Sequence, residues 1–264
     1  MSTTSSLASK RIESLLDESS FVEIGALVTA RATDFNLKQT ETPSDGVVTG
    51  YGVIDGNLVY VYSQDASVLN GSVGEMHAKK IANLYDLAMK TGAPVIGLID
   101  SAGLRLQEAT DALNAFGEIY LKQTLASGVI PQITAIFGSC GGGLALMPTL
   151  TDFTFMEESK AKLFVNAPNT LDGNHVSKCD SASAKFQSEE AGIVDVVADE
   201  ATIYAKIREL VSMLPGNNED DASYEECTDD LNRVCGDLAN CVGDTAIALS
   251  TIADNNVFFE VKEN

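Results

Sequence analysis

The sequence has few of the residues that build metal centres or bind polyanions. Only two of its 264 residues are histidines, His77 and His175, and its five cysteines form no Cys-x-x-Cys pair. A zinc site would therefore need widely scattered ligands, and no metal site is predicted. Lys and Arg number 17 against 38 Asp and Glu, a formal net charge of -21, without any basic run. Because a phosphate backbone binds clustered cations, nucleic acid and anionic membrane surfaces are not expected partners.

Long apolar runs and a signal peptide are also missing. No stretch approaches the roughly 18 apolar residues that a membrane span requires. The polar residues 1–10 lack the apolar core of a secretory signal, and the cysteine count is odd. We therefore expect a cytoplasmic protein with reduced thiols and no direct membrane insertion. Hydrophobic residues make up 45% of the chain and charged residues 21%, values typical of a globular protein rather than a disordered one.

The pattern of apolar residues predicts an α/β fold. The predicted helices are residues 8–18, 74–90, 108–127 and 201–214, and the predicted strands are residues 47–52, 58–63, 94–100, 131–137, 151–156, 162–165 and 193–197. The first two strands flank an Asp-Gly turn and indicate a hairpin. The later alternation of strands and helices indicates a mostly parallel sheet with right-handed crossovers.

Ligands of parallel sheets bind at the carboxyl ends of the strands, and glycine-bearing turns follow two predicted strands there. In the later turn, Gly141, Gly142 and Gly143 precede a predicted helix. The first helical turn leaves N–H groups unpaired and favours negative charge, which predicts an oxyanion site. Tight helix-to-strand packing explains three glycines equally well. Phosphate binding fits less well, because neither a Gly-x-Gly-x-x-Gly spacing nor the Lys-Ser/Thr of a P-loop is present.

The earlier turn, residues 101–105, offers a second candidate donor opposite the first. Its Arg105 either holds a phosphate or pairs with Glu108 on the following helix. For Asp100, Glu75 and Glu108, helix capping or surface placement is a commoner role than general-base catalysis.

A hydrolase is a rival interpretation of the second glycine turn. Residues 138–142 (GSCGG) fit Gly-x-Cys-x-Gly, the cysteine form of a nucleophile elbow. Cys140 would then need His175 as its base and Asp152 or Asp172 as the group that orients the histidine. Few residues separate Cys140 from His175, which leaves little room for the strands that normally intervene. As alternatives, Cys140 is a small buried thiol, and His77, beside two lysines on a predicted helix, has a packing or solvated role.

A short pattern occurs twice in the sequence. Residues 16–24 (LDESSFVEI) and residues 253–261 (ADNNVFFEV) share a helix-exit and strand-entry pattern. We infer that residues 1–216 form one domain and that residues 217–264 comprise an acidic linker and the start of a second, homologous domain. The rest of that domain is supplied by another polypeptide or has been removed from this one.

Five segments of the chain together carry a specific resemblance. They are residues 46–52 (GVVTGYG), 59–65 (VYVYSQD), 71–81 (GSVGEMHAKKI), 92–98 (GAPVIGL) and 125–133 (LASGVIPQI). In this order they closely resemble the biotin-dependent acyl-CoA carboxyltransferases, which include propionyl-CoA and acetyl-CoA carboxylase β subunits and the decarboxylase α subunits of anaerobes. The resemblance runs from about residue 11 to residue 199 and covers the amino-terminal half of the family's two-domain subunit.

The resemblance implies a crotonase-like (ClpP/crotonase) fold of repeated β-β-α units. In the family, the acyl-CoA lies mainly on the amino-terminal domain and carboxybiotin on the carboxyl-terminal one. The match places the family's paired glycines on Gly142 and Gly143, whose N–H groups would polarise the CoA thioester carbonyl and hold the enolate. The proton is implied to pass to a biotin nitrogen. Gly141, Ala102 and Gly103 are the implied substrate-binding residues.

The resemblance also implies partners. These are a carboxyl-terminal carboxyltransferase half or subunit and a separate biotin carrier protein, in a homo- or hetero-oligomer. A non-catalytic subunit that binds acyl-CoA or serves assembly is the alternative. Where the family usually has Thr-Gly-Pro and a long glycine-rich segment, this chain has residues 166–170 (NAPNT) and a shortened, polar stretch at 172–183. Since that segment helps to shape the acyl-binding region, the acyl group and the direction of the reaction stay open.

Overall fold

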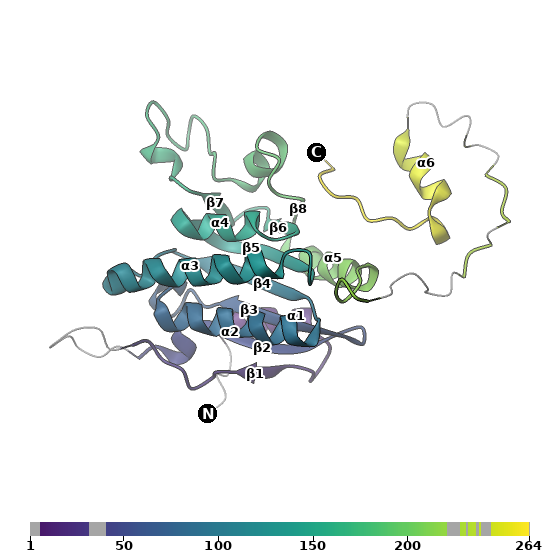
Figure 1. The fold of residues 1–264 in the computed structure, drawn as a ribbon. Coiled ribbons are helices and arrows are strands. Elements are labelled where there is room, and N and C mark those ends of the chain that lie inside the picture. Colours follow the sequence, from purple (N-terminus) through teal and green to yellow (C-terminus); the bar gives the residue numbers. More distant parts are fainter. Residues whose placement is uncertain are drawn as a thin grey trace.

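The computed structural model describes residues 6–31, 41–220, 228–230, 232–235, 238 and 244–263 (Figure 1). Within this part of the chain, the strands form one mixed β-sheet. The strands are β1 (Val22–Ile24), β2 (Val47–Ile54), β3 (Asn57–Gln64), β4 (Val95–Ser101), β5 (Gln132–Gly141), β6 (Phe153–Glu157), β7 (Lys162–Phe164) and β8 (Val196–Ala198). The helices are α1 (Leu7–Leu15), α2 (Glu75–Thr91), α3 (Ala109–Ala126), α4 (Leu146–Thr149), α5 (Glu200–Met213) and α6 (Thr245–Ile252). The strand order is β1-β2-β3-β4-β5-β6-β8, with β7 paired to β5.

The sheet begins as a hairpin and continues as a parallel sheet. Strands β2 and β3 are antiparallel, and the turn between them has positive φ at Asp55 and Gly56 (48° and 89°), which an Asp-Gly pair tolerates well. From β3 onwards each neighbouring pair is parallel. The predicted α/β class is confirmed.

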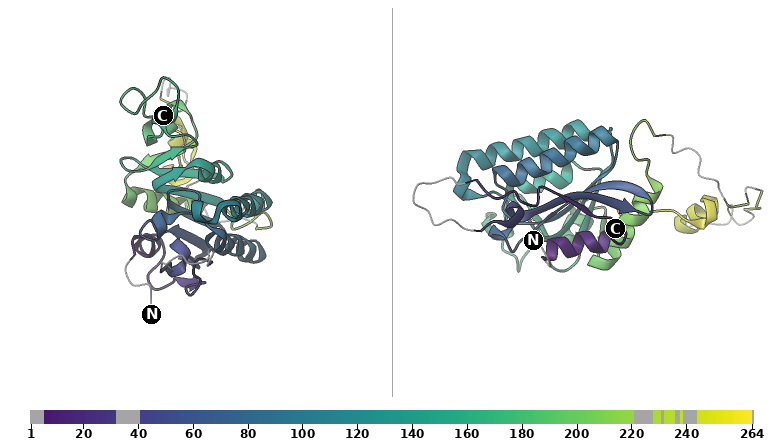
Figure 2. Two further views of the ribbon diagram at one scale, coloured as in Figure 1. Left: turned by 90° about the vertical axis from the view of Figure 1, so that its left-hand side faces the viewer. Right: turned by 90° about the horizontal axis from the view of Figure 1, so that it is seen from below.

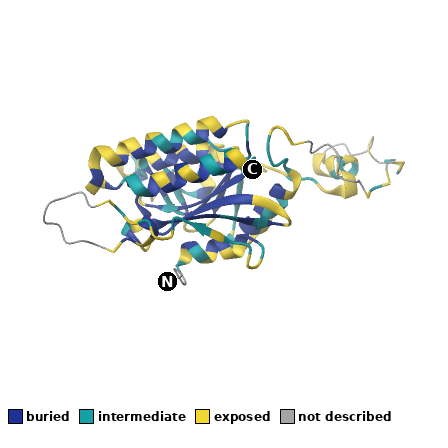
Figure 3. Ribbon diagram, turned by 60° about the horizontal axis from the view of Figure 1, so that its bottom comes forward, coloured by how far each residue is buried: buried dark blue, intermediate teal, exposed yellow. Residues whose placement is uncertain are grey.

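Helices cover both faces of the sheet (Figure 2). Successive strand residues point to opposite faces: Tyr60 and Tyr62 of β3 join one core, whereas Val61 joins the other. The first core packs against α2 and α3, and the second against α1 and α5. The central strands β4 and β5 are therefore buried on both sides (Figure 3), which explains why their sequences are continuous apolar runs.

The observed strand bounds differ from the predicted ones by a few residues, most of all in β5 and β8. Strand β5 extends beyond Phe137 to Gly141, because its end pairs with β7 through Ser139↔Lys162, Cys140↔Leu163 and Gly141↔Phe164. Strand β8 starts at Val196, later than predicted. The helix after the glycines begins as a 3-10 turn, Gly142–Ala145, before the short α4.

The repeated sequence pattern is also a repeated backbone conformation. At the end of α1, Leu16 N–H donates to Ile12 O, and at the end of α6, Ala253 N–H donates to Leu249 O. One turn later, Ser20 N–H donates to Asp17 O and Val257 N–H donates to Asp254 O, both at 3.1 Å. The equivalent residues Ser19 and Asn256 both have a φ of 60°. The two copies differ afterwards: β1 pairs with β2, whereas residues 257–261 form no strand.

Three further predictions concern the cysteines, membrane spans and the domain boundary. Cys140, Cys179 and Cys235 are free thiols, whereas Cys227 and Cys241 lie outside the described residues, as does part of the predicted acidic linker. Among the helices that the structure describes, none is both long and apolar enough to span a bilayer. The cytoplasmic location and the boundary at residue 216 stay predictions.

Candidate functional site

The two glycine-bearing turns lie side by side at the carboxyl edge of the sheet. They follow the adjacent parallel strands β4 and β5, whose last paired residues are Ser101 and Cys140. Gly103 has a φ of 94°, and a Cβ there would lie 2.8 Å from the Gly141 carbonyl oxygen. A side chain at this position would separate the turns. The structure thus brings together the predicted residues Ala102, Gly103, Gly141, Gly142 and Gly143.

Phe164 forms one wall of the second turn. It is the residue of β7 paired with Gly141, and a Cβ on Gly141 would lie 2.8 Å from its ring. The absence of a side chain at Gly141 therefore lets a half-buried aromatic ring pack directly on the backbone. Phe164 was not among the predicted site residues.

Gly142 and Gly143 present their backbone at the surface of this turn. Gly142 is half-buried and has a φ of 64°, and Gly143 is exposed. Within the described chain, neither N–H group donates to a side chain or to a loop carbonyl. They open a 3-10 turn, whose first N–H groups have no partner within the turn. Two adjacent free donors without side chains can approach an anionic oxygen closely.

A side chain from α3 holds the end of the same turn. The Tyr120 hydroxyl donates a hydrogen bond of 2.5 Å to the Gly143 carbonyl oxygen. Sequence spacing gives no signal for this contact, because it joins two elements that only the fold brings together.

The N–H groups of Ala102 and Gly103 have partners inside the protein. Ala102 N–H donates to the Asn70 carbonyl oxygen at 2.9 Å, and Gly103 N–H donates to Ser101 Oγ at 3.0 Å. The expected second donor is thus not free at either residue. A substrate-binding role for them stays a prediction that depends on their position beside Gly141.

Arg105 stabilises the first turn through buried contacts and is not available to hold a phosphate. Its side chain is 2% exposed and forms ion pairs of 2.6 Å with Asp45 and 2.9 Å with Glu108. It also donates to the Ser72 carbonyl oxygen at 2.7 Å. Burial raises the pKa of Asp45, and the Arg105 charge opposes that rise. The pairing with Glu108 is therefore the correct one of the two predicted roles.

The three carboxylates considered as general bases have structural roles. The other carboxylate oxygen of Glu108 accepts the Glu75 N–H at 2.6 Å and so caps the start of α2. Glu75 itself pairs with Lys79 at 2.6 Å, and Asp100 pairs with Arg11 at 3.0 Å.

His77 is buried on α2 and acts in packing. Its Nδ1 lies 3.0 Å from the Asp45 carbonyl oxygen and its Nε2 lies 3.2 Å from Gln64 Nε2. Burial, helped by the charges of Arg105 and Lys80, lowers the pKa of His77 to about 3. The imidazole is therefore neutral at physiological pH.

The hydrolase alternative lacks an assembled site. Cys140 is fully buried, its thiol lies 3.7 Å from the Leu144 carbonyl oxygen, and burial raises its pKa, which disfavours the thiolate. His175 lies in an exposed loop after β7. Asp152 lies at the start of β6, on the opposite edge of the sheet, where it accepts the Gln132 N–H at 2.8 Å. Cys140 is thus a small buried thiol in the core, which was the alternative to its role as a nucleophile.

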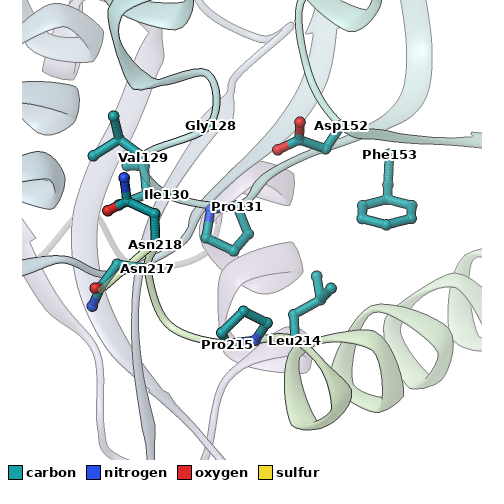
Figure 4. A pocket seen from close by; sticks show the side chains of 10 residues that line it. All are labelled: Gly128, Val129, Ile130, Pro131, Asp152, Phe153, Leu214, Pro215, Asn217 and Asn218. Atoms are coloured by element: carbon teal, nitrogen blue, oxygen red, sulfur yellow. The ribbon is translucent and has the colours of Figure 1, made fainter. Parts of the chain in front are cut away.

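A cavity of about 370 Å³ opens at the amino-terminal edge of the strands, away from the glycine turns (Figure 4). It is lined by Gly128, Val129, Ile130, Pro131, Asp152, Phe153, Leu214, Pro215, Asn217 and Asn218. Its walls are mostly apolar side chains. It contains Asp152 of the hydrolase alternative but none of the residues predicted for the acyl-CoA site, and it is not part of the candidate site.

Comparison with known proteins agrees with the resemblance found in the sequence. Residues 2–264 match the family described as "Carboxyl transferase domain". The chain is 41% identical to methylmalonyl-CoA decarboxylase subunit alpha of Veillonella parvula and 39% identical to the propionyl-CoA carboxylase beta chain of Roseobacter denitrificans. In both cases the match covers 97% of this chain and 52% of the relative. The chain thus spans about half the length of these relatives.

A solved structure of a similar protein has the same fold. Transcarboxylase 12S, a hexamer with hydrolysed methylmalonyl-coenzyme A bound, superposes with a TM-score of 0.91 at 34% identity, over 97% of this chain and 51% of the other. The predicted crotonase-like fold is confirmed.

Proposed function

Because the chain belongs to the carboxyl transferase domain family, we propose that it binds an acyl-CoA and stabilises its enolate while a carboxyl group moves to or from biotin on a carrier protein. One observation carries the proposal: Gly142 and Gly143 present free N–H groups at the carboxyl edge of the sheet. In this role the chain supplies one half of a carboxyltransferase.

The chemistry assigned to this chain is the stabilisation of negative charge. When a thioester loses CO2 or a proton from its α-carbon, the negative charge moves onto the carbonyl oxygen. The N–H groups of Gly142 and Gly143 would donate to that oxygen and bind the enolate more strongly than the neutral thioester. One preorganised donor of this kind typically lowers a barrier by about 2.7–4 kcal/mol. Gly141, Ala102 and Gly103 would shape the backbone around the thioester.

The ionisable groups near the turns support placing the base elsewhere. Asp100 and Glu108 are paired with arginines, and His77 is buried. Cys140 and Tyr120, the closer groups, both have a raised pKa and are neutral at physiological pH. This arrangement fits a reaction in which biotin, when bound, carries the CO2 and accepts the proton. We assign biotin to the other half of the enzyme.

The repeated element at the carboxyl end supports a partner half. Leu249 and Ile252 of α6 occupy the positions that Ile12 and Leu15 occupy in α1. The α1 residues are 0% exposed beneath the hairpin β2–β3, whereas Leu249 and Ile252 are 49% and 61% exposed. We assign α6 to a second domain of the same kind, completed by a carboxyl-terminal half. Assembly into a hetero-oligomer follows from this assignment.

The names of the relatives suggest an acyl group. Propionyl-CoA carboxylase and methylmalonyl-CoA decarboxylase are named after two molecules that differ by the one carboxyl group that such an enzyme moves. We therefore assign the propionyl-CoA and methylmalonyl-CoA pair as substrates. The direction of the reaction would depend on the partner subunits.

The test measures carboxyl transfer from methylmalonyl-CoA to free biotin, with the full chain alone and together with a carboxyl-terminal half. We expect transfer only with the partner, and faster transfer from methylmalonyl-CoA than from malonyl-CoA. Acyl-CoA binding without transfer under any combination would instead support the non-catalytic assembly subunit.

A further inference from the structure

Tyr120 is a polar residue of α3 that the reaction described above does not use. Its hydroxyl donates to the Gly143 carbonyl oxygen at 2.5 Å. Its ring lies against Phe116, with centroids 5.9 Å apart and an interplanar angle of 31°. The ring is thus supported by its own helix, and the hydroxyl reaches the glycine turn from a rigid element.

The turn is held at both ends and is unsupported between them. At one end, Gly141 lies in the β5–β7 ladder under the Phe164 ring. At the other, the Gly143 carbonyl oxygen accepts two hydrogen bonds, from Tyr120 Oη and from Leu146 N–H. Between these points, nothing lies within 4 Å of the place where a Gly142 Cβ would be. Because glycine backbones rotate freely, the directions of the Gly142 and Gly143 N–H groups depend on the two ends.

We propose that Tyr120 is a positioning residue, whose hydroxyl holds the Gly143 carbonyl so that the N–H groups of Gly142 and Gly143 stay directed at the acyl-CoA thioester oxygen. The proposal rests on the proposed function, because it takes the thioester as the ligand of these donors. Two further observations agree with it. Partial burial raises the pKa of Tyr120, so the phenol keeps its proton and remains a donor. A Cβ on Gly143 would lie 3.1 Å from Tyr120 Oη, closer than an ordinary contact, so a side chain there would press against the hydroxyl.

The test replaces the hydroxyl and keeps the ring. In the full chain assembled with its carboxyl-terminal half, Tyr120→Phe is expected to lower kcat about tenfold and to change KM for the acyl-CoA less than about twofold, since donor alignment matters most in the transition state. Tyr51→Phe is the matched control. The Tyr51 ring lies against that of Tyr60 in β2–β3, tilted by 49°, away from the turn. Tyr51→Phe removes the same hydroxyl group, and no effect on kcat is expected.

A spectroscopic measurement reports the donors directly. Acyl-CoA labelled with carbon-13 at the thioester carbonyl gives an isolated infrared stretch, and hydrogen bonding to the oxygen lowers its frequency. We expect a lowered frequency for the wild-type complex and a return toward the free value in Tyr120→Phe. An unchanged kcat together with an unchanged frequency would overturn the positioning role. A wild-type complex that binds acyl-CoA without lowering the frequency would overturn the proposed function instead.

A second variant covers the case in which Tyr120→Phe does not fold. Gly143→Ala keeps the tyrosine but places a methyl group against its hydroxyl, and it should lower kcat and raise the carbonyl frequency in the same way. If both variants fold, their effects on kcat should be less than additive, because both break one contact. Wild-type behaviour of Gly143→Ala, or full additivity of the two changes, counts against the contact.

Discussion

Gly142 has a backbone φ of 64°, and nothing surrounds the position of its missing Cβ. Gly142→Ala therefore tests the conformation rather than steric fit. Since an L-residue in the left-handed region costs about 1–2 kcal/mol, we expect the free energy of unfolding to fall by a similar amount or the turn to relax. Either response misaligns the donors, and kcat should fall about tenfold or more. Steady-state kinetics and urea denaturation measure the two quantities.

Gly117 supplies the matched control. It lies within α3 and also has nothing within 4 Å of its Cβ position. Gly117→Ala should raise the free energy of unfolding by about 0.5–1 kcal/mol, because alanine favours the helix, and should leave kcat unchanged. An equal loss of activity in both variants would contradict the special role of Gly142.

Individual site residues were predictable only where local backbone chemistry decides the outcome. The accessible glycines at 142 and 143 follow from a strand that ends in glycines before a helix. The partners of Ala102 and Gly103 were not predictable, because Asn70 and Ser101 reach their N–H groups only in the folded turn. Tyr120 was missed for the same reason.

The short elements around Arg105 are joined through its buried guanidinium. Asp45 belongs to the turn before β2, Ser72 precedes α2, and Glu108 precedes α3. Arg105→Met leaves two carboxylates buried without their cation, so the free energy of unfolding should fall by about 3–5 kcal/mol. Urea denaturation measures this loss.

Arg31→Met is the control for that change. Arg31 pairs with Glu75 and Asp111 but its side chain is 45% exposed, and exposed pairs contribute little to stability, so this variant should unfold much as the wild type does. If Arg105→Met instead kept its stability and raised KM for the acyl-CoA, Arg105 would bind a phosphate after all.

His77 makes the packing of α2 dependent on pH. Its pKa is about 3 in the folded protein, against an ordinary value of 6.5 in the unfolded chain. Above pH 6.5 both states are neutral and the stability is complete. As the pH falls below 6.5, only the unfolded chain takes up the proton, so the free energy of unfolding should fall by about 1.4 kcal/mol per pH unit.

Urea denaturation between pH 7.5 and about pH 5, above the range in which ordinary carboxyl groups titrate, isolates this contribution. His77→Gln removes the titrating group, and its free energy of unfolding should change less with pH across the same range. Parallel pH profiles for the two proteins would show that His77 is not the source.

The elements themselves were predicted well because the sheet is buried on both faces. Apolar runs such as residues 94–100 have no other stable place than a central strand, and α2 and α3 repeat at the helical period. The predicted bounds are wrong where pairing with a strand distant in the sequence determines the end of an element. The extension of β5 to Gly141 depends on pairing with β7, and the sequence of residues 138–141 alone indicates a turn.

At the scale of the whole molecule, the described strands form one sheet, and we propose that α6 begins a second unit. Helix α6 has no buried residue, although the residues that follow it repeat the backbone conformation of those that follow α1. The sequence predicted this unit from the repeated pattern, but it could not predict which surface would cover it. We propose that α6 packs in the partner half as α1 packs here, against an apolar hairpin face like that of Val48, Val59 and Val61.

The same substitution at equivalent positions of α1 and α6 separates folding from assembly. Ile12→Asp places a charge in the core and should abolish folding or cost several kcal/mol (about 3 or more). Leu249→Asp places it on an exposed helix, and the free energy of unfolding should change by about 0.5 kcal/mol or less. Association of Leu249→Asp with the carboxyl-terminal half should nevertheless weaken at least about tenfold, because an apolar anchor is lost from the interface.

Sedimentation of the chain with the carboxyl-terminal half measures the association, and urea denaturation measures the fold. Leu125→Asp, a change at a residue of α3 that is 54% exposed, controls for the charge alone and should leave both quantities unchanged. If Leu249→Asp unfolded the domain as Ile12→Asp does, α6 would belong to the domain described here. If it folded and still associated normally, the partner would bind elsewhere, and the exposed face of α6 would not be its docking surface.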